Sequence, residues 1–289
     1  MKVYTYSENK KIGSFFGTTL CLGYFDGVHI AHRKLFEKAK EYGKWGVLLF
    51  DRNVKKMPLL TAMPEKIRLI EKAGADYVII AEFSESFMNK SPEEFVKFLA
   101  KTLNISRAVA GYDYRFGKNA SGDAETLLKL AKDAGLSVEI VDALCENGEP
   151  VKSTKIRDYV EKGDITSANI LLGYEYMISG KVEKGLGNGH KLGFPTANVA
   201  YDSEKLLPPD GVYAGSACQK PAVINIGKNP TFSAKKRTLE VHIPGFDGDL
   251  YDKVIEISFS EKIRDDIKFK NMDELKNQIR KDVEYVKGR

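Results

Sequence analysis

The sequence has few cysteines, no long apolar run and little net charge, and the first two of these absences each argue against a class of protein. Its cysteines are Cys21, Cys145 and Cys218, which are far apart and in no CxxC spacing, so they fit reduced intracellular thiols better than disulfides or a zinc site. Every apolar run is far shorter than the roughly 20 residues that a membrane span needs, and no apolar segment near the N-terminus resembles an export signal. We therefore expect a cytoplasmic protein that binds no membrane.

The charge balance is mild, because 45 basic residues stand against 40 acidic ones and the net charge is +5. Such a balance suits phosphate-bearing small molecules as well as nucleic acid, so charge alone does not identify a ligand. The length of 289 residues is roughly that of two average domains. We therefore expect two domains with separate cores.

Apolar runs of strand length alternate with helical periodicity in the first half of the chain. One helix is expected after Ser91, its N-cap, with Pro92 as first residue, and another begins near His32. This alternation predicts an α/β domain with a doubly wound parallel sheet, whose ligands bind at the carboxyl ends of the strands. The predicted strands are residues 17–25, 45–50, 76–83, 107–114 and 137–144.

The stretch GYFDGVHIAH, which begins at Gly23, lies where the first predicted strand of this sheet ends and its helix begins. A helix N-terminus offers unpaired N–H groups and a positive dipole end to phosphate, and the imidazoles of His29 and His32 can add donors. Gly23 and Gly27 allow close backbone approach, and Asp26 can brace the turn. A purely structural role for the histidines stays open, whereas a zinc site would lack further ligands nearby.

After Tyr159, short strands separated by turns replace the alternation, which predicts a mostly antiparallel sheet closed as a barrel. One amphipathic helix should follow, with four apolar residues facing inward: Met272, Leu275, Ile279 and Val283. We therefore expect domains at residues 1–158 and 159–289, each able to bury its own core.

The second half contains the glycine-rich stretch GLGNGHKLGFPTAN, which fits neither a P-loop nor a Rossmann fingerprint. Leu192 follows Lys191, and Pro195 forbids the helix that a P-loop requires. The stretch instead predicts a loop that wraps ATP with backbone donors and one lysine. Thr196 and Asn198 then offer two oxygen ligands of the kind that Mg²⁺ prefers, although simple turn polarity would also explain them.

The stretch LEVHI, residues 239–243, alternates apolar and polar side chains. Glu240 and His242 must therefore share the face of the strand opposite to the apolar residues. A carboxylate on that face can accept the proton of an attacking hydroxyl.

Several of these stretches, taken in order, resemble the bifunctional riboflavin kinase/FMN adenylyltransferases, also called FAD synthetases. GYFDGVHIAH is similar to the GNFDGVHxGH form of that family, VAGYDYRFGKNASGD (109–123) to VxGxDFxFGxxxxGD, and VKSTKIR (151–157) to an SSTxIR segment. GHKLGFPTAN, PPDGVYAG, INIGKNPTF and LEVHIPGFDGDLYDK match the riboflavin kinase pattern. The resemblance spans nearly the whole chain.

The resemblance implies two successive activities. The C-terminal barrel would transfer the γ-phosphoryl of ATP to riboflavin with Mg²⁺ on Thr196 and Asn198, and Glu240 would act as base. The N-terminal domain would adenylylate the FMN product to FAD and release pyrophosphate. The implied partners are riboflavin, FMN and ATP, with no nucleic acid, and the sequence allows a monomer.

The resemblance also implies the site residues, with Glu240, His29 and His32 in catalysis and Glu240 and Arg264 in flavin binding. The implied ATP contacts of the adenylyl site are Gly23, Phe25, Asp26, Gly27, His29, His32, Asp113, Arg115, Ser153, Thr154 and Arg157. Those of the kinase site are Gly185, Gly187, Gly189, His190, Lys191, Gly193, Pro195 and Thr196.

Structural alternatives exist for some of these residues. Ser153 and Thr154 precede a helical segment and can simply cap it, and Asp113 and Arg115 can form a buried ion pair.

Other functional classes also stay open. They are another HxGH nucleotidyltransferase, a class I aminoacyl-tRNA synthetase suggested by HIAH with VKSTK, and a non-catalytic nucleotide- or RNA-binding module.

Four features depart from the family pattern and concern the adenylyl site. Tyr24 replaces the usual asparagine, Ala31 a glycine and Lys152 a serine, and FDRNVKK (50–56) stands where the family has a turn with proline and histidine. Flavin contacts around Asp51–Asn53 cannot be carried over for this reason. A riboflavin kinase with a weak or divergent adenylyltransferase domain is therefore the alternative function.

Overall fold

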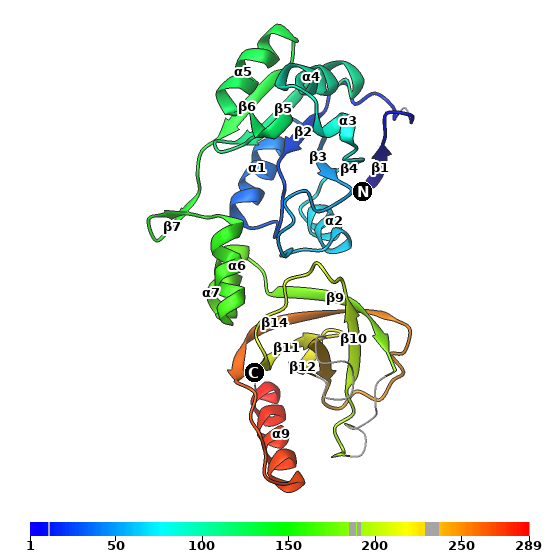
Figure 1. Ribbon diagram of the computed structural model, residues 1–289, viewed down its shortest axis with the longest axis vertical. Coiled ribbons are helices and arrows are strands. Elements are labelled where there is room, and N and C mark those ends of the chain that lie inside the picture. Colours follow the sequence, from blue (N-terminus) through cyan, green and yellow to red (C-terminus); the bar gives the residue numbers. More distant parts are fainter. Residues whose placement is uncertain (11, 185–188, 190–191, 229–236, 289) are drawn as a thin grey trace. The chain divides into compact units, whose positions relative to one another are not determined.

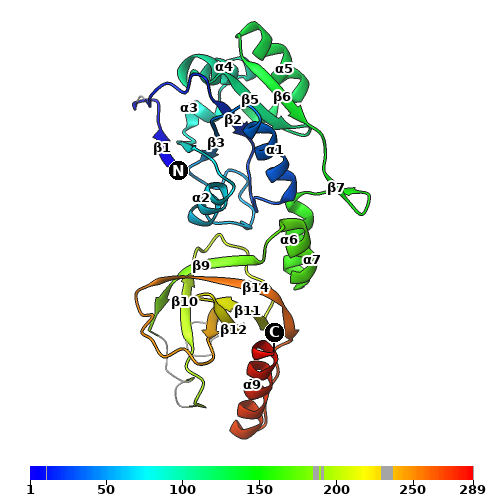
Figure 2. The same ribbon diagram turned by 180° about the vertical axis from the view of Figure 1, so that it is seen from behind.

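The computed structural model describes residues 1–10, 12–184, 189, 192–228 and 237–288. The chain forms two compact units, shown in Figure 1 and from behind in Figure 2. The first, the sheet unit, contains Met1–Met57 and Met63–Lys152, and the second, the barrel unit, contains Pro58–Ala62 and Ser153–Arg289.

The sheet unit is built on six parallel strands in the order β1-β4-β3-β2-β5-β6. Five of them confirm the predicted strands, and β1 adds one at the edge beside β4 that was not predicted. The strands are β1 (Lys2–Tyr6), β2 (Thr19–Leu22), β3 (Trp45–Phe50), β4 (Tyr77–Ala81), β5 (Arg107–Gly111) and β6 (Ser137–Val141).

The helices of the sheet unit connect its strands, as the doubly wound prediction requires (Figure 1). The capping prediction at Ser91 is confirmed, because its hydroxyl accepts from Glu94 N while the Glu94 side chain accepts from Ser91 N. The helices are α1 (Ile30–Lys40), α2 (Met63–Lys72), α3 (Glu85–Met88), α4 (Pro92–Lys97), η1 (Phe98–Thr102), η2 (Lys118–Ala120) and α5 (Ala124–Asp133). A short hairpin of β7 (Cys145–Glu146) and β8 (Glu149–Pro150) follows β6.

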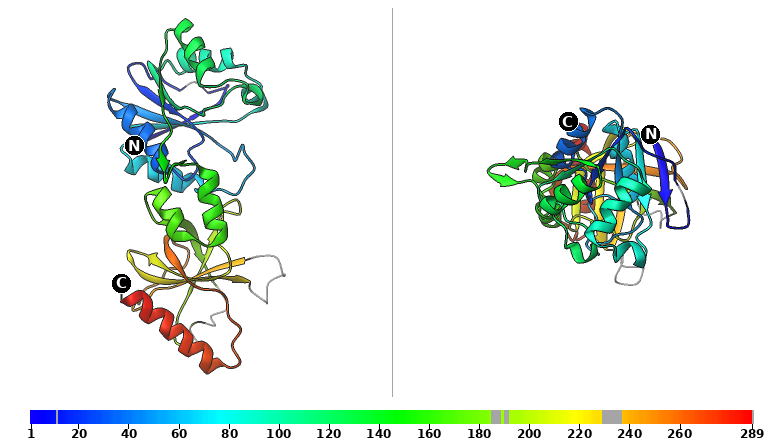
Figure 3. Two further views of the ribbon diagram at one scale, coloured as in Figure 1. Left: turned by 90° about the vertical axis from the view of Figure 1, so that its left-hand side faces the viewer. Right: turned by 90° about the horizontal axis from the view of Figure 1, so that it is seen from above.

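The barrel unit contains six antiparallel strands that close in the order β10-β13-β12-β11-β14-β9, which confirms the predicted barrel. Helices α6 (Ser153–Lys162) and α7 (Ile165–Leu172) precede the barrel and α9 (Met272–Lys287) follows it (Figure 3). The strands are β9 (Tyr176–Glu183), β10 (Ala197–Tyr201), β11 (Gly211–Ala217), β12 (Lys220–Lys228), β13 (Arg237–His242) and β14 (Val254–Arg264).

The terminal helix α9 packs on the barrel through its C-terminal half. Val283 and Val286 are buried against Val212 of β11 and Val223 of β12, and Ile279 packs against the same cluster. Met272 is 57% exposed, so the prediction that it faces inward is wrong. The helical period placed Met272 on the apolar stripe, but the residues of α9 that are buried in the barrel cluster, Val283 and Val286, lie in its C-terminal half.

The barrel unit also includes a five-residue segment from the first half of the chain, residues 58–62. Leu59 pairs with Lys205 as a parallel bridge, and Leu206 N donates to Leu59 O at 2.8 Å. The buried Lys205 Nζ donates to Leu60 O at 2.5 Å. Residues that precede position 159 therefore belong to the compact unit of the barrel.

Within the described residues, no helix combines the length and apolarity that crossing a bilayer requires.

The closed barrel requires a glycine at position 215, because a Cβ there would overlap the Ser258 carbonyl of the paired strand and lie 2.8 Å from Ile224 Cδ1. We expect Gly215→Ala to lower the free energy of unfolding of the barrel unit by about 1–3 kcal/mol or more. Gly227→Ala, also on a barrel strand, is the matched control, because among the described residues its Cβ would meet only the Asn225 amide at 3.9 Å. Scanning calorimetry of both full-length variants checks this, and equal transition temperatures would contradict it.

Candidate functional site

Three of the singled-out stretches leave neighbouring strands at one edge of the parallel sheet. Leu22, the last residue of β2, pairs with Leu48 of β3 on one side and with Ala110 of β5 on the other. The stretch after β2 with the two histidines therefore starts between the stretch after β3 and the stretch after β5. The chain order reverses direction at β2, which is where open α/β sheets bind their ligands.

The turn between β2 and α1 has an unusual backbone. Phe25, Gly27 and Val28 all have positive φ, at 51°, 85° and 37°. Left-handed backbone is rare for a β-branched residue such as Val28, and strained residues of this kind cluster at functional sites. Phe25 is fully buried, and a Cβ at Gly23 would lie 2.9 Å from its ring. The tight backbone of this turn therefore explains why glycine stands at positions 23 and 27.

The two histidines of the turn stack on each other. Their ring centroids are 3.5 Å apart with an interplanar angle of 18°, and Phe25 lies 5.2 Å from the His32 ring. His29 is the N-cap residue of α1 and is 4% exposed, while His32 is half-buried with its Nδ1 enclosed and making no hydrogen bond. Burial, and then the charges of His29, Lys66 and Lys55, hold the pKa of His32 well below its usual value. His32 is therefore neutral near pH 7 and can donate a hydrogen bond without carrying charge.

Asp113 and Arg115, which follow β5, are exposed and do not form the buried ion pair that was considered for them. Asp113 Oδ2 lies 3.4 Å from Lys152 Nζ, and Arg115 pairs with Asp123 at 3.3 Å. Exposed pairs of this kind add little stability, so stability does not account for these residues. Lys152, one of the departures from the family, thus has Asp113 as its neighbour.

The predicted phosphate-binding residues Ser153, Thr154 and Arg157 lie on α6 in the barrel unit. The helix begins at Ser153, so Ser153 and Thr154 form part of its first turn and do not precede it. Arg157 is buried, and its Nε donates to Pro58 O at 2.9 Å. Their joint role with the histidines of the sheet unit stays a prediction.

In the barrel unit, Glu240 lies between two asparagines. It pairs with Asn198 of β10 on one side and with Asn225 of β12 on the other. Directly paired residues share a face, with Cβ atoms about 4.5–5.5 Å apart. The strand neighbours Leu239 and Val241 are each 1% exposed while Glu240 is half-buried, which confirms the predicted alternation. Burial raises the pKa of the Glu240 carboxyl.

Asn225 was not predicted as a site residue, although the sequence contained a signal for it. Ile224 and Ile226 are fully buried, so the asparagine between them must face the other side of β12. The same alternation identified Glu240 in β13. The hydrogen-bond register between the two strands then makes these two polar residues neighbours.

The described part of the glycine-rich loop folds tightly around Thr196. Phe194 N donates to Gly189 O at 2.9 Å, and a Cβ at Gly189 would lie 2.9 Å from Thr196 Oγ1. His242 Nδ1 lies 2.8 Å from Pro195 O, so this buried histidine anchors the loop to β13. Gly193 has a φ of 84°, which explains the glycine there. The predicted ATP contacts Gly185, Gly187, His190 and Lys191 lie outside the described residues.

Arg264, a predicted flavin contact, is engaged in an ion pair. Its NH2 lies 2.8 Å from Asp282 Oδ2, and the Asp282 carboxylate is buried on α9. The pair fastens α9 to the end of β14. The flavin contact itself stays a prediction.

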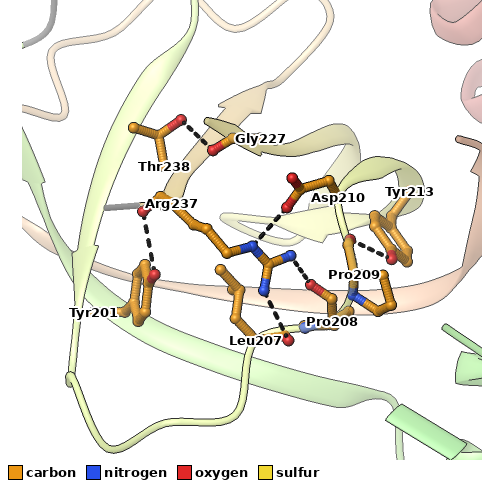
Figure 4. A network of polar contacts seen from close by, with 9 residues as sticks. All are labelled: Tyr201, Leu207, Pro208, Pro209, Asp210, Tyr213, Gly227, Arg237 and Thr238. Atoms are coloured by element: carbon orange, nitrogen blue, oxygen red, sulfur yellow. Dashed lines mark hydrogen bonds and ion pairs between the residues drawn. The ribbon is translucent and has the colours of Figure 1, made fainter. Parts of the chain in front are cut away.

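Arg237, the first residue of β13, ties this strand to the loop that precedes β11 (Figure 4). Its Nε donates to Asp210 Oδ1 at 2.6 Å, and its NH1 and NH2 donate to the carbonyls of Leu207 and Pro208. Tyr201 donates its hydroxyl to the Arg237 carbonyl at 3.2 Å. The network fixes β13 three residues before Glu240, and sequence reasoning did not find it.

Comparison with known proteins adds family information to this geometry. The family model described as riboflavin kinase matches residues 172–288, and the one described as FAD synthetase matches residues 14–155. A bifunctional riboflavin kinase/FMN adenylyltransferase from Bacillus subtilis is 35% identical over 92% of this chain and 90% of its own length. The chain belongs to the bifunctional riboflavin kinase/FMN adenylyltransferase family. The relative from Haemophilus influenzae is also 35% identical, over 94% of each chain.

The family assignment gives each candidate site its domain. The FAD synthetase model covers the stacked histidines, and the riboflavin kinase model covers the Glu240 strand and its two asparagines. The family assignment also rules out the aminoacyl-tRNA synthetase and RNA-binding alternatives. A crystal structure of a protein from Streptococcus pneumoniae named as a macrolide-efflux protein is 28% identical, with a TM-score of 0.89 over 100% of both chains. The fold is thus shared along its whole length.

The kcat/KM of riboflavin phosphorylation should decrease at low pH because the Glu240 carboxylate becomes protonated. We call this part of the pH–rate profile its acid limb. A base accepts a proton only when deprotonated, and burial raises the pKa of this carboxyl above 4.5, so kcat/KM should fall as pH drops through the raised value. A pH–rate profile of FMN formation measures the limb. Glu183→Gln is the control, because Glu183 is an exposed carboxylate paired with the other side of Asn198 and should leave the limb in place. A limb at or below 4.5, or one lost in Glu183→Gln, would contradict this role.

Proposed function

We propose that residues 159–289 form the riboflavin kinase and residues 1–158 the FMN adenylyltransferase of a two-step flavin cofactor enzyme. Riboflavin and ATP give FMN and ADP, and FMN and a second ATP give FAD and pyrophosphate. The observation that carries the proposal is the register that sets Glu240 between Asn198 and Asn225 inside the region of the riboflavin kinase match. The stacked histidines at the edge of the sheet support the second step.

In the kinase step, the Glu240 carboxylate accepts the proton of the riboflavin ribityl hydroxyl while that oxygen attacks the γ-phosphorus of ATP. Partial burial makes the carboxylate a stronger base than an exposed one. The glycine-rich loop would hold the ATP phosphates with backbone N–H groups. Gly189 packs closely on Phe194 O and Thr196 Oγ1, so a Cβ at position 189 would collide with the loop itself.

The same site suits Mg²⁺. Thr196 offers a hydroxyl and Asn198 an amide oxygen two residues apart, and both are hard donors that fit a shell shared with phosphates and water. Among the described residues no group of three or more His, Cys, Asp or Glu is gathered to hold a metal, so an oxygen site of this sparse kind is the one we propose. When bound, Mg²⁺ neutralises phosphate charge in the transition state.

In the adenylyl step, the FMN phosphate attacks the α-phosphorus of ATP and pyrophosphate leaves. His29 and His32 would stabilise the charge that develops on the phosphate oxygens, with Ser153 and Arg157 contributing from α6. None of these residues forms a covalent intermediate in this proposal. We further propose that the protein acts in the cytoplasm and that a monomer suffices for both steps, which size-exclusion chromatography with light scattering and an activity assay of the monomer fraction would check.

A riboflavin kinase with a divergent adenylyltransferase domain is the second candidate. Two departures from the family pattern favour it because they touch each other: Tyr24 donates its hydroxyl to Asn53 Oδ1 at 2.8 Å. The two departures thus form one contact beside the histidine motif. The two candidate functions differ only in whether the protein forms FAD.

His29→Ala should separate the two activities. The purified protein is incubated with riboflavin, ATP and Mg²⁺, and riboflavin, FMN and FAD are quantified by chromatography. The wild type should form FMN and then FAD. His29→Ala should lower FAD formation by about 10²-fold or more, because it removes a donor to the transition state, while FMN accumulates. If both activities fell together with the melting temperature, a structural role for His29 would be the better explanation.

Glu240→Gln should have the opposite effect in the same assay. It keeps the shape of the side chain and removes the base, so riboflavin stays unphosphorylated while supplied FMN is still converted to FAD. Supplied FMN is the control for an intact adenylyl site. Normal riboflavin phosphorylation by Glu240→Gln would exclude Glu240 as the base, and unchanged riboflavin with the wild type would refute the kinase assignment.

A further inference from the structure

The segment that follows β3 is held against the histidine turn by Tyr24. The Tyr24 hydroxyl donates to Asn53 Oδ1 at 2.8 Å, and Asn53 Nδ2 donates to Met57 O at 2.8 Å. Asp51 anchors the start of the segment by accepting from Phe83 N at 2.9 Å. The conformation of residues 51–57 is therefore tied to the residue that directly follows Gly23 of the histidine motif.

Two lysines lie around the Tyr24 ring. Lys55 Nζ is 5.1 Å from the ring centroid and Lys66 Nζ is 4.7 Å from it, within the range of cation–π attraction. Lys66, on α2, is 5% exposed and donates to Tyr24 O at 3.1 Å. Lys55 is exposed on the surface. Tyr24 thus gathers one buried and one accessible cation at the same place.

These cations lie close to the stacked histidines. The charges of Lys66 and Lys55 both contribute to the low pKa of His32, after burial and the charge of His29. Both positive charges oppose protonation of His32, and the charge of the exposed Lys55 would attract an anion that binds beside the imidazole. The accessible member, Lys55, can reach a ligand at the carboxyl edge of β2, whereas Lys66 is fixed by its bond to the backbone of Tyr24.

We propose that Lys55 is a phosphate-binding residue of the adenylyl-transfer site, positioned by Tyr24 through its ring and through Asn53. The inference rests on the proposed function of the histidine site. It accounts for Tyr24 and the segment 50–56 departing from the family pattern together, because the two form one contact. The phosphate belongs either to ATP or to FMN, and the chemistry of recognition is the same for both.

The test compares Lys55→Met with Lys56→Met in the full-length protein. Lys56 is the adjacent exposed lysine, so both variants lose the same charge from the same segment. With supplied FMN and ATP, Lys55→Met should raise the KM of one substrate by about tenfold or more, as expected for loss of a charge-assisted hydrogen bond. Lys56→Met should stay within about twofold, and riboflavin kinase activity should be unchanged in both. Equal parameters for the two variants would overturn the proposal.

The substrate whose KM rises identifies the phosphate. A raised KM for ATP with weaker inhibition by inorganic pyrophosphate assigns Lys55 to ATP, and a raised KM for FMN alone assigns it to FMN. Lys55→Arg should restore most of the affinity. Tyr24→Phe removes the hydroxyl bond to Asn53 and should raise the same KM with kcat preserved, which a merely structural loss of stability would not do. An unchanged KM in Tyr24→Phe would show that the Tyr24 hydroxyl has no part in positioning Lys55, and an unchanged KM in Tyr24→Leu would exclude the ring as well.

His29→Ala separates a failure of this inference from a failure of the site. If His29→Ala abolishes adenylyl transfer and Lys55→Met does nothing, the site is right and Lys55 has no part in it. If neither variant affects adenylyl transfer, the histidine site itself is wrong.

Discussion

The hydrogen-bond register between neighbouring strands decides where the candidate functional side chains lie in both units. In the parallel sheet, the pairing of Leu22 with Leu48 and Ala110 makes three loops start at one edge. In the barrel, the pairing of Glu240 with Asn198 and Asn225 gathers three polar side chains on one face. A slip of one residue in β13 would turn Glu240 toward the face of Leu239 and remove the proposed base from the candidate site.

Burial shifts the pKa values of the two candidate groups in opposite directions, although its physical effect on both is the same. It disfavours the charged form of each group, so it keeps His32 neutral and makes Glu240 more basic. A neutral imidazole can donate a hydrogen bond to a phosphate, and a basic carboxylate can accept a proton from a hydroxyl. The same physical cause therefore suits a transfer that needs donors in one unit and a transfer that needs a base in the other.

Apolar periodicity predicted most of the fold, because strands β2 to β6 and the barrel strands bury continuous or alternating apolar runs. It missed β1, where only Tyr6 is buried, and it misplaced Met272, because a helical stripe does not reveal where its partner surface ends. Motif resemblance found the histidines and Glu240. Neighbours supplied by distant segments, such as Asn53 beside Tyr24 and residues 58–62 in the barrel unit, depend on tertiary contacts that no local pattern encodes.

One chain performs two transfers in series, first of the γ-phosphoryl group and then of the adenylyl group. Tracing the phosphorus atoms tests it most directly, with riboflavin, Mg²⁺ and ATP that carries ³²P at either the γ or the α position. We expect γ label in the phosphate of FMN and in FAD, and α label in FAD but never in FMN. FAD that lacks the γ label, or FMN that carries the α label, would contradict it.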